Sequence, residues 1–242
     1  MTGKPVAGEQ IPSPNNTARD YDIGGTDLGT GKWEKERSAS FSETLSEKTG
    51  RQVIPLTGGR TRWHGHNWTL YKGLFSADSK FAQMALWEKD GYIYSMGSII
   101  GRRGLPYIAR FKKQYILTPD KWEYWSKTKG WIEGKAIYAT PLFGNTKDQM
   151  YAEPTLVYHD YFQKWITVYY NEIKNRIVLR SADELTGPCS DEQFVASGSQ
   201  YPMPYGGFIY PLNLDKPEIY ISMSQYHPLY NVFLMRVELK EK

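Results

Sequence analysis

Two aspartates, Asp22 and Asp27, are the residues of this 242-residue chain whose type and spacing point most directly to chemistry. They lie in Tyr21–Gly29, a glycine-rich and largely apolar run with no basic residue between the two carboxylates. Glycine lets the backbone come close to another segment or a ligand, and crowded carboxylates can take different pKa values and divide acid and base work. The other interpretation is a turn before a strand, in which each aspartate bonds its own backbone.

Aromatic residues are the outlier of the composition, since 19 Tyr, 8 Trp and 9 Phe make up 15% of the chain. Tyr and Trp combine a flat apolar face with a polar tip, which suits both β-sheets and clefts that pack aromatic faces on sugar rings. The net charge is only +4 and the basic residues are scattered. We therefore do not expect a nucleic-acid partner.

Membrane and secretion signals are weak in this sequence. No run approaches the roughly 18 apolar residues of a membrane span, and residues 1–14 lack the apolar core of a signal peptide. We expect a cytoplasmic protein, a mature form whose leader is gone, or part of a particle that needs no leader. Cys189 is the only cysteine, which excludes internal disulfides and thiolate metal clusters, and its turn context indicates a structural or incidental role.

Short β-rich runs separated by turns dominate from Phe81 onward. Asp90-Gly91 between two apolar runs is a strong hairpin signal. The order strand, tight turn, strand, loop, strand recurs along the chain. We expect strands at 81–87, 92–97 and 107–111, at 153–158, 165–170 and 176–180, and at 207–211, 218–223 and 231–236.

An arginine closes the third strand of each of these units, at Arg110, Arg180 and Arg236. Because the position recurs, we expect these arginines to pair strands or blades rather than to do chemistry. Repeated units of three antiparallel strands are typical of β-propeller blades, whereas a β-sandwich, the alternative, gives no reason for the repeat. The sequence therefore predicts one all-β propeller domain over residues 1–242, with an extended arm at 1–20 and a polar loop or short surface helix at 31–50.

In a propeller the first strand of each blade lines the central channel, so the starts of these strands meet. Acids that are far apart in the sequence would then share one small pocket. The segments expected at these positions carry Asp22, Asp27, Gln83, Glu153, Tyr205 and Tyr210.

A further set of phrases occurs in a fixed order along the chain. These phrases are Gly24–Gly29, Asp90–Tyr94, Gly101-Arg102, Glu123–Trp125, Trp131, Glu153, Trp165, Ile177–Arg180, Thr186–Pro188, Tyr205–Ile209, Ser224-Gln225 and Tyr230–Arg236. Together they resemble a family long catalogued as a domain of unknown function, found in actinobacteria, their phages and some gut bacteria. The family includes endo-D-arabinanases, which cut the D-arabinan of mycobacterial-type cell walls, and the resemblance implies a five-bladed β-propeller.

The resemblance implies a glycoside hydrolase, and glycosidic cleavage usually needs two carboxyl groups that flank the bond. We expect Asp27 to be the general base or nucleophile. Glu153 is expected to be the general acid or a second pocket carboxylate, with a pKa raised by partial burial, or else a structural glutamate that bonds backbone amides. Asp22 either supplies the missing acid or caps a turn. The sequence does not decide between inversion and retention, because that depends on the carboxyl separation.

The chain departs from the family pattern in one place. Family members usually carry a second aspartate in a Gly-Asp-Thr phrase, and no such phrase stands between Leu28 and Trp63. Gln52–Gly59 looks like a remnant of the second blade, so we expect residues 31–62 to be an irregular or truncated second-blade region. Either the first two blades are abbreviated or part of the natural chain is missing from this sequence.

Several further side chains are candidates for sugar binding. Arg102 either reaches the cleft, where it would bind sugar hydroxyls or orient a carboxylate, or is a solvated loop arginine. His64 and His66 would share a strand face, but no third ligand is visible nearby, so we expect neither a metal nor another cofactor. The remaining candidates, whose aromatic members are also compatible with ordinary packing, are Gln83, Trp68, Tyr205, Tyr210, Gln225, Tyr226 and His227.

Two functions remain open from the sequence. The first is an endo-acting hydrolase of D-arabinan or a related furanoside polymer, and the second is a non-catalytic propeller that binds glycan or protein. We expect a monomer, and its expected partner is an arabinan-type polysaccharide. The corresponding location is extracellular, with the leader absent from this chain, or on a phage particle.

Overall fold

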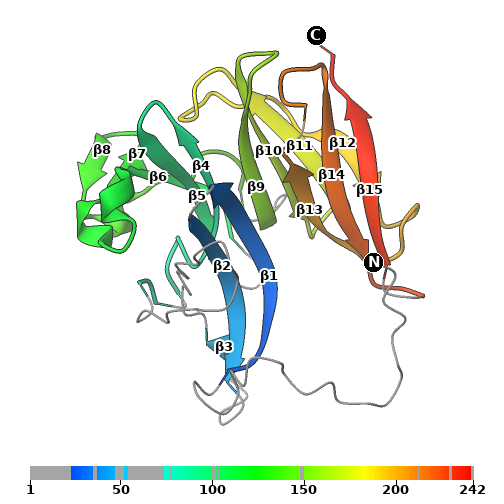
Figure 1. Cartoon of the computed structure of the whole chain (residues 1–242), viewed down its shortest axis with the longest axis horizontal. Coiled ribbons are helices and arrows are strands. Elements are labelled where there is room, and N and C mark those ends of the chain that lie inside the picture. Colours follow the sequence, from blue (N-terminus) through cyan, green and yellow to red (C-terminus); the bar gives the residue numbers. More distant parts are fainter. Residues whose placement is uncertain are drawn as a thin grey trace.

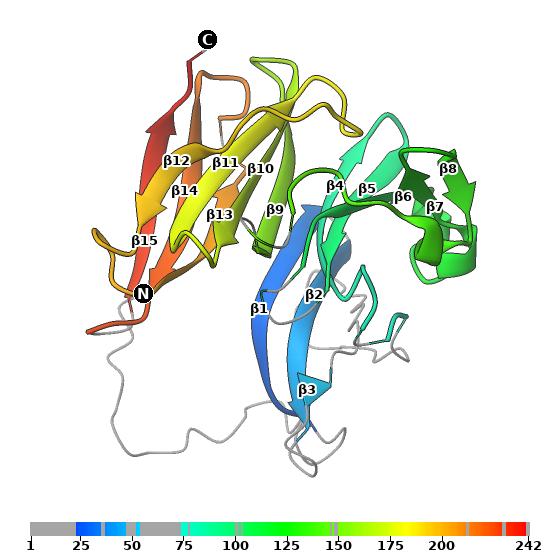
Figure 2. The same ribbon diagram turned by 180° about the vertical axis from the view of Figure 1, so that it is seen from behind.

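The structure, a computed structural model, describes residues 23–34, 37–46, 52–53, 74–76, 78–99, 102, 104–145, 147, 150–211, 213–228 and 231–240, and over the first three of these ranges only the backbone. These residues form an all-β protein with four antiparallel sheets and three short 3-10 helices. The sheets follow one another in chain order, and they do not close into a ring (Figures 1 and 2).

The first sheet pairs its strands in chain order, β1-β2-β3. Its strands are β1 (Ile23–Glu34), β2 (Arg37–Ser46) and β3 (Gln52–Val53). The loop or short helix expected over 31–50 is therefore wrong, because Ala39, Phe41 and Leu45 alternate with polar residues along β2 and the abundant serines hide this period of two. Val53 pairs with Thr44, so Gln52 and Val53 belong to the first sheet, whereas the rest of the expected second-blade remnant lies outside the described residues.

The second sheet has five strands in chain order. They are β4 (Gln83–Lys89), β5 (Tyr92–Ser98), β6 (Tyr107–Phe111), β7 (Glu123–Ser126) and β8 (Gly130–Glu133), accompanied by 3-10 helices η1 (Lys113–Tyr115), η2 (Pro119–Lys121) and η3 (Ala136–Tyr138). Asp90 and Gly91 join β4 to β5 with φ values of 51° and 74°. Both central residues of the turn are left-handed, which confirms the predicted two-residue hairpin.

The third and fourth sheets contain the other predicted units. Their strands are β9 (Tyr151–His159), β10 (Lys164–Asn171), β11 (Arg176–Ala182) and β12 (Gln193–Ser197), then β13 (Pro204–Tyr210), β14 (Glu218–Gln225) and β15 (Asn231–Glu238). The nine strands predicted from Phe81 onward are all present, with boundaries shifted by a few residues. Three further strands, β7, β8 and β12, were not predicted, and they extend two of the units beyond three strands.

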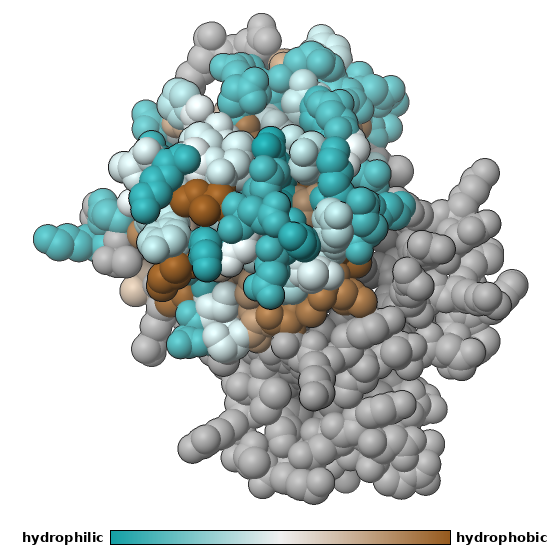
Figure 3. Space-filling model, turned by 90° about the vertical axis from the view of Figure 1, so that its left-hand side faces the viewer, coloured by the Kyte–Doolittle hydropathy of each residue, from teal (hydrophilic) through white to brown (hydrophobic). Residues whose placement is uncertain are grey.

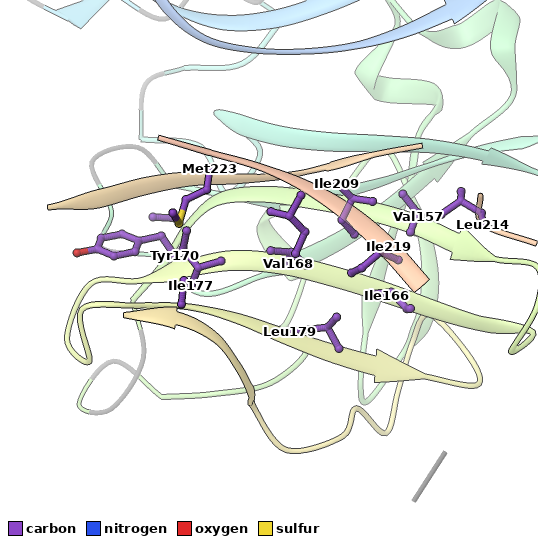
Figure 4. Packing of buried hydrophobic residues seen from close by; sticks show 13 residues of the cluster. Val157, Ile166, Val168, Tyr170, Ile177, Leu179, Ile209, Leu214, Ile219 and Met223 are labelled. Atoms are coloured by element: carbon purple, nitrogen blue, oxygen red, sulfur yellow. The ribbon is translucent and has the colours of Figure 1, made fainter. Parts of the chain in front are cut away.

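The main hydrophobic core lies between the third and fourth sheets (Figure 4). Val168 of β10, Ile177 of β11 and Ile219 of β14 are fully buried there. Each such side chain contributes about 1.5–3 kcal/mol relative to an exposed one. β10 is buried along almost its whole length, in keeping with its continuous apolar run, because neighbouring sheets cover both of its faces.

The outer surfaces of the sheets differ from this core in polarity and exposure. On the side of β7 and β8 the surface is mostly hydrophilic, with a few hydrophobic patches (Figure 3). Along β15 every second residue is exposed, and Val232 and Leu234 are 55% and 67% exposed. The part of the chain that the structure describes contains no helix with the length and apolar character of a membrane span.

Candidate functional site

The first strands of successive sheets lie beside one another, with β1 against β4, β4 against β9 and β9 against β13. Gln83 begins β4 and pairs with Ser98 at the end of β5, so the loop after β5 lies at the same end of the sheet as the start of β4. This loop reaches the third sheet, where the Tyr151 N–H donates to the Gly104 carbonyl at 2.9 Å. The starts of β4 and β9 therefore meet around Arg102, which lies in this loop.

Arg102 and Glu153 form the centre of the site. The Arg102 Nη2 and Nε atoms lie 2.6 and 2.8 Å from Glu153 Oε1, and Arg102 Nη1 lies 3.4 Å from Glu172 Oε2. The Glu153 side chain is 1% exposed, whereas that of Arg102 is 38% exposed. The carboxylate is thus buried beneath a guanidinium group that still faces solvent.

The backbone at Glu153 is held in an unusual conformation. Glu153 has a φ of 52°, and the pairing between β9 and β10 shifts register at this point, so that Glu153 and Pro154 together face Tyr169. Arg102 is also left-handed, with a φ of 59°. Non-glycine residues rarely adopt this conformation, and such strain is concentrated at functional sites. Both partners of the ion pair therefore carry local strain that the surrounding structure offsets.

Gly206 supplies a third contact from the fourth sheet, because its backbone N–H donates to Glu153 Oε2. It has a φ of 63° and lies in a bulge of β13, where Gly206 and Gly207 face Met223. A Cβ at Gly207 would lie 2.7 Å from Ile177 Cγ2, so only glycine allows β13 to approach the third sheet this closely. The two glycines thus bring the amide of Gly206 onto the buried carboxylate.

Two tyrosines flank the guanidinium group of Arg102. Its Cζ atom lies 5.3 Å from the centre of the Tyr170 ring and 5.6 Å from that of the Tyr205 ring. Burial alone would lower the pKa of Arg102, but the charges of Glu153 and Glu172 outweigh it and raise that pKa. Burial also raises the pKa of Tyr170 to about 12. At neutral pH the site therefore combines a guanidinium group, two aromatic faces and a buried carboxyl group, and the positive charge favours the ionised form of that carboxyl.

Sequence reasoning missed Tyr170 and Glu172 as members of this site. Both were hidden in an apolar run and its following turn, since Tyr170 ends that run in β10 and Glu172 follows directly after Asn171. Only the pairing of Tyr170 with Ala152, next to Glu153, brings them to the site.

Three predicted catalytic or binding residues have no described side chain. Asp22 and Trp68 lie outside the described residues, as do His64 and His66. The backbone of Asp27 lies in β1, opposite Glu43 of β2. The position of the Asp27 carboxyl group therefore stays a prediction.

Most of the other predicted residues lie at the end of the sheets where Arg102 lies, and Tyr210 lies apart from them. Gln83 and Tyr205 lie at the starts of β4 and β13, at the same end as Arg102. Gln225 ends β14 beside the start of β13, and its Nε2 donates to the His227 carbonyl at 2.5 Å.

Tyr226 lies beside this end of β13, because its N–H donates to the Met203 carbonyl at 3.1 Å. Its side chain is 60% exposed. Tyr210 does not join the group, because it is the last residue of β13, at the end opposite Tyr205. The expectation that Tyr210 lies at a strand start is wrong, since β13 begins at Pro204 and continues through the bulge to Tyr210.

The recurring arginines each pair with a glutamate of their own sheet. Arg110 Nε lies 2.8 Å from Glu123 Oε2, and Arg236 Nε lies 2.5 Å from Glu218 Oε2. Arg180 is buried near Glu192, at 3.8 Å. These contacts join strands within a sheet, in keeping with the structural role predicted for them. Within the described residues, no three His, Cys, Asp or Glu side chains gather as a metal site requires.

Comparison with known proteins adds a family and a fold. The sequence pattern of DUF4185, "Domain of unknown function", matches residues 30–236. No curated protein matches the sequence. The endo-arabinase of Bacteroides thetaiotaomicron VPI-5482 is similar in structure, with a TM-score of 0.60 and 11% identity over 92% of this chain and 79% of that one.

Two structures from Bacteroides ovatus are also similar. An inferred hydrolase has a TM-score of 0.56 and 12% identity over 87% of this chain, and the xyloglucan PUL GH43B protein has a TM-score of 0.54 and 16% identity over 89%. This chain spans only 60% and 39% of their respective lengths. At such low identity the likeness shows a shared all-β fold.

Proposed function

The chain belongs to the DUF4185 family, and from this premise we propose that it is an endo-acting glycoside hydrolase of D-arabinan or a related furanoside polymer. The observation that carries the proposal is the strained, buried pair of Arg102 and Glu153 at the meeting point of three sheets. Both partners of this ion pair are among the non-glycine residues with a positive φ, a strained conformation that is concentrated at functional sites. The fold shared with an endo-arabinase and the proposed completion of the ring into a five-bladed propeller agree with this assignment.

The roles follow from the chemistry of glycosidic cleavage, which passes through an oxocarbenium-like transition state between two carboxyl groups. The Arg102 charge favours an ionised Glu153, so Glu153 suits a second pocket carboxylate that stabilises positive charge better than it suits a proton donor. Asp27 is proposed as the general base or nucleophile, and Asp22 as the acid.

Substrate recognition is proposed to use the exposed side of the site. The Arg102 fork keeps solvent-facing N–H groups that can donate to sugar hydroxyls, and Tyr205 and Tyr170 offer aromatic faces beside it. Gln225, Tyr226 and His227 lie at the same end and extend the polar surface. Trp68 remains a proposed sugar contact. The substrate would thus be met by aromatic faces and hydrogen-bond donors, as polysaccharides require.

The experiment that tests this proposal is incubation with purified mycobacterial-type arabinogalactan, followed by chromatography of the released sugars. We expect short arabino-oligosaccharides from the wild type and at least about a 100-fold loss of release in Asp27→Asn and Glu153→Gln. Asp160→Asn, an exposed aspartate in the turn at the far end of β9, is the matched control and should retain full release. No release by a folded wild-type chain would refute the hydrolase.

A non-catalytic glycan- or protein-binding propeller is the second candidate, and one observation favours it. Both Glu153 oxygens already accept hydrogen bonds, from Arg102 and from the Gly206 amide. A carboxylate satisfied in this way can serve structure alone. This candidate predicts that Asp27→Asn leaves a measured binding constant for arabinogalactan nearly unchanged and that no oligosaccharide appears with any variant.

A further inference from the structure

A hollow of about 490 Å³ lies in the third sheet, between the turn that joins β10 to β11 and the edge strand β12. Its walls are Lys174–Arg176, Phe194 and Ser197–Ser199. The volume falls in the range of small-molecule sites. None of these residues belongs to the Arg102–Glu153 site or was singled out from the sequence.

One wall of the hollow is aromatic. Phe194 lies on the edge strand β12 and is 55% exposed, with the Arg176 guanidinium 6.0 Å from the centre of its ring. An exposed ring beside a planar group of hydrogen-bond donors presents both an apolar face and polar contacts to a ligand. Sugar rings offer the complementary surface, since they have C–H faces edged by hydroxyl groups.

The remaining walls are polar and closely fitted. The hydroxyls of Ser197 and Ser199 lie 2.7 Å apart, and either can turn toward a ligand. A Cβ on Gly198 would lie 2.0 Å from Asn175 Nδ2, so the carboxamide of Asn175 lies directly on the glycine backbone. Lys174 is neutralised by Glu192 at 2.6 Å. With Lys174 paired, the groups that face the hollow are hydroxyls, a carboxamide and the Arg176 guanidinium, which together suit a hydroxyl-rich ligand.

Tyr170 connects this hollow to the Arg102–Glu153 site. Its ring lies 5.3 Å from the Arg102 Cζ atom, and its hydroxyl donates to Asn175 Oδ1 at 2.8 Å. Tyr170 lies at one end of the hydrophobic core with its hydroxyl pointing away from the other labelled residues (Figure 4). The two sites are thus separated by a single tyrosine side chain and lie at the same end of the third sheet.

We propose that the hollow is a second sugar-binding site, which holds a neighbouring segment of the same polysaccharide chain that occupies the Arg102–Glu153 site. The inference rests on the proposed function for the identity of the polymer. Phe194 packs on a sugar ring, and Arg176, Ser197 and Ser199 bind its hydroxyls. An enzyme that cuts inside a polymer gains from holding the chain on more than one site, because the second contact is then intramolecular.

The test is native gel electrophoresis in gels that contain purified arabinogalactan, with retardation converted to a binding constant. It uses the full chain in the Asp27→Asn background, so that the polymer stays intact. Phe194→Ala should weaken binding about three- to tenfold. Tyr161→Ala is the matched control, because Tyr161 is 54% exposed in the turn at the other end of β9, and it should leave binding unchanged.

A second variant tests the geometry. In Gly198→Ala the added methyl group must displace the Asn175 carboxamide from Tyr170, so binding should weaken while circular dichroism stays that of the folded chain. Equal retardation of the parent protein, Phe194→Ala and Gly198→Ala overturns the second site, and so does an absence of retardation in the parent.

The proposed hydrolase and the second site fail separately. If the wild type releases no oligosaccharide but Phe194→Ala still weakens retardation, the hydrolase is refuted and the sugar site stands. If oligosaccharides are released and neither variant alters retardation, the hydrolase stands and the second sugar-binding site is refuted.

Discussion

The Arg102 guanidinium and the Glu153 carboxylate lie 2.6 Å apart, although Arg102 follows a strand of the second sheet and Glu153 lies in the first strand of the third. The Glu153 side chain is 1% exposed. A charge buried to this extent is tolerated only while it is paired and hydrogen-bonded. The pair therefore joins two sheets as well as forming the centre of the proposed active site.

Removing Arg102 should destabilise the protein. In Arg102→Ala the buried Glu153 loses its charged partner, and we expect the free energy of unfolding to fall by about 1–3 kcal/mol. Urea denaturation followed by tryptophan fluorescence measures this change. Arg176→Ala, at an exposed arginine that begins β11, is the control and should change the free energy by less than about 0.5 kcal/mol.

The unpaired charge of Glu153 should account for much of this loss of stability. Adding Glu153→Gln to Arg102→Ala removes the unpaired charge, so the double variant should be less destabilised than the sum of the two single changes. Strict additivity would show that the two side chains do not interact, and the ion pair would lose its assigned role.

Gly206→Ala should lower the melting temperature more than Gly130→Ala does. Gly206 has a φ of 63° and an added Cβ would lie 2.9 Å from the Phe208 ring, whereas Gly130 has a φ of 69° with no atom within 4 Å of a Cβ. Both alanines carry the left-handed cost of about 1–2 kcal/mol. Only Gly206→Ala adds a steric clash and disturbs the amide that binds Glu153. Thermal melts of the two variants should therefore separate, and coincident melting temperatures would contradict the assigned packing.

Cys189 should react slowly with thiol reagents. Burial raises the pKa of its thiol to about 11, although the nearby charges of Arg180 and Lys127 oppose this rise. At pH 8 the thiolate fraction is then small, and we expect alkylation by iodoacetamide to be about 100-fold slower than for an exposed cysteine. Mass spectrometry follows the modification, and denaturation in urea should restore the ordinary rate. Rapid alkylation of the folded chain would show that the thiol is exposed.

Stability should fall in acid partly through Glu192. Burial alone would raise the pKa of Glu192, but hydrogen bonds from Lys174, Tyr169 and Asn171 outweigh it and lower that pKa from 4.5. Because the folded-state pKa lies below the unfolded value, the contribution to stability is present above pH 4.5 and is lost as the pH falls through the folded-state pKa.

Melting temperatures of the wild type and Glu192→Gln between about pH 6 and pH 3 measure this contribution. The difference between the two proteins should shrink toward acid. A constant difference over the whole range would mean that Glu192 is not titrating in this window.

The repeated strand units were readable from the sequence because turn chemistry and apolar runs are local signals. Asp90-Gly91 predicted its hairpin correctly, since a two-residue turn needs residues that accept a positive φ. β2 was not recognised because its many serines hide the alternation of Ala39, Phe41 and Leu45 with polar residues, and its pairing with β1 shows that it is a strand.

The candidate site was also predicted only in part, since the sequence marked some of its residues but not the contacts between them. The sequence marked Glu153 and Tyr205 as residues near strand starts and Arg102 as a loop arginine that could reach the cleft. Their mutual contacts did not follow, since Arg102 and Glu153 are 51 residues apart and meet only through the approach of two sheets. Tyr170 gave no sequence signal at all.

The sequence by itself determined the all-β class, the strand units after Phe81 and the residues available for sugar chemistry, because each depends on interactions between near neighbours in the chain. Tertiary structure alone decided that Glu153 is buried and ion-paired, that Gly206 donates to it, and that Tyr210 lies at the far end of its strand. Burial and charge pairing depend on which sheets pack together, and that arrangement is a property of the whole chain, so no local pattern of residues contains it.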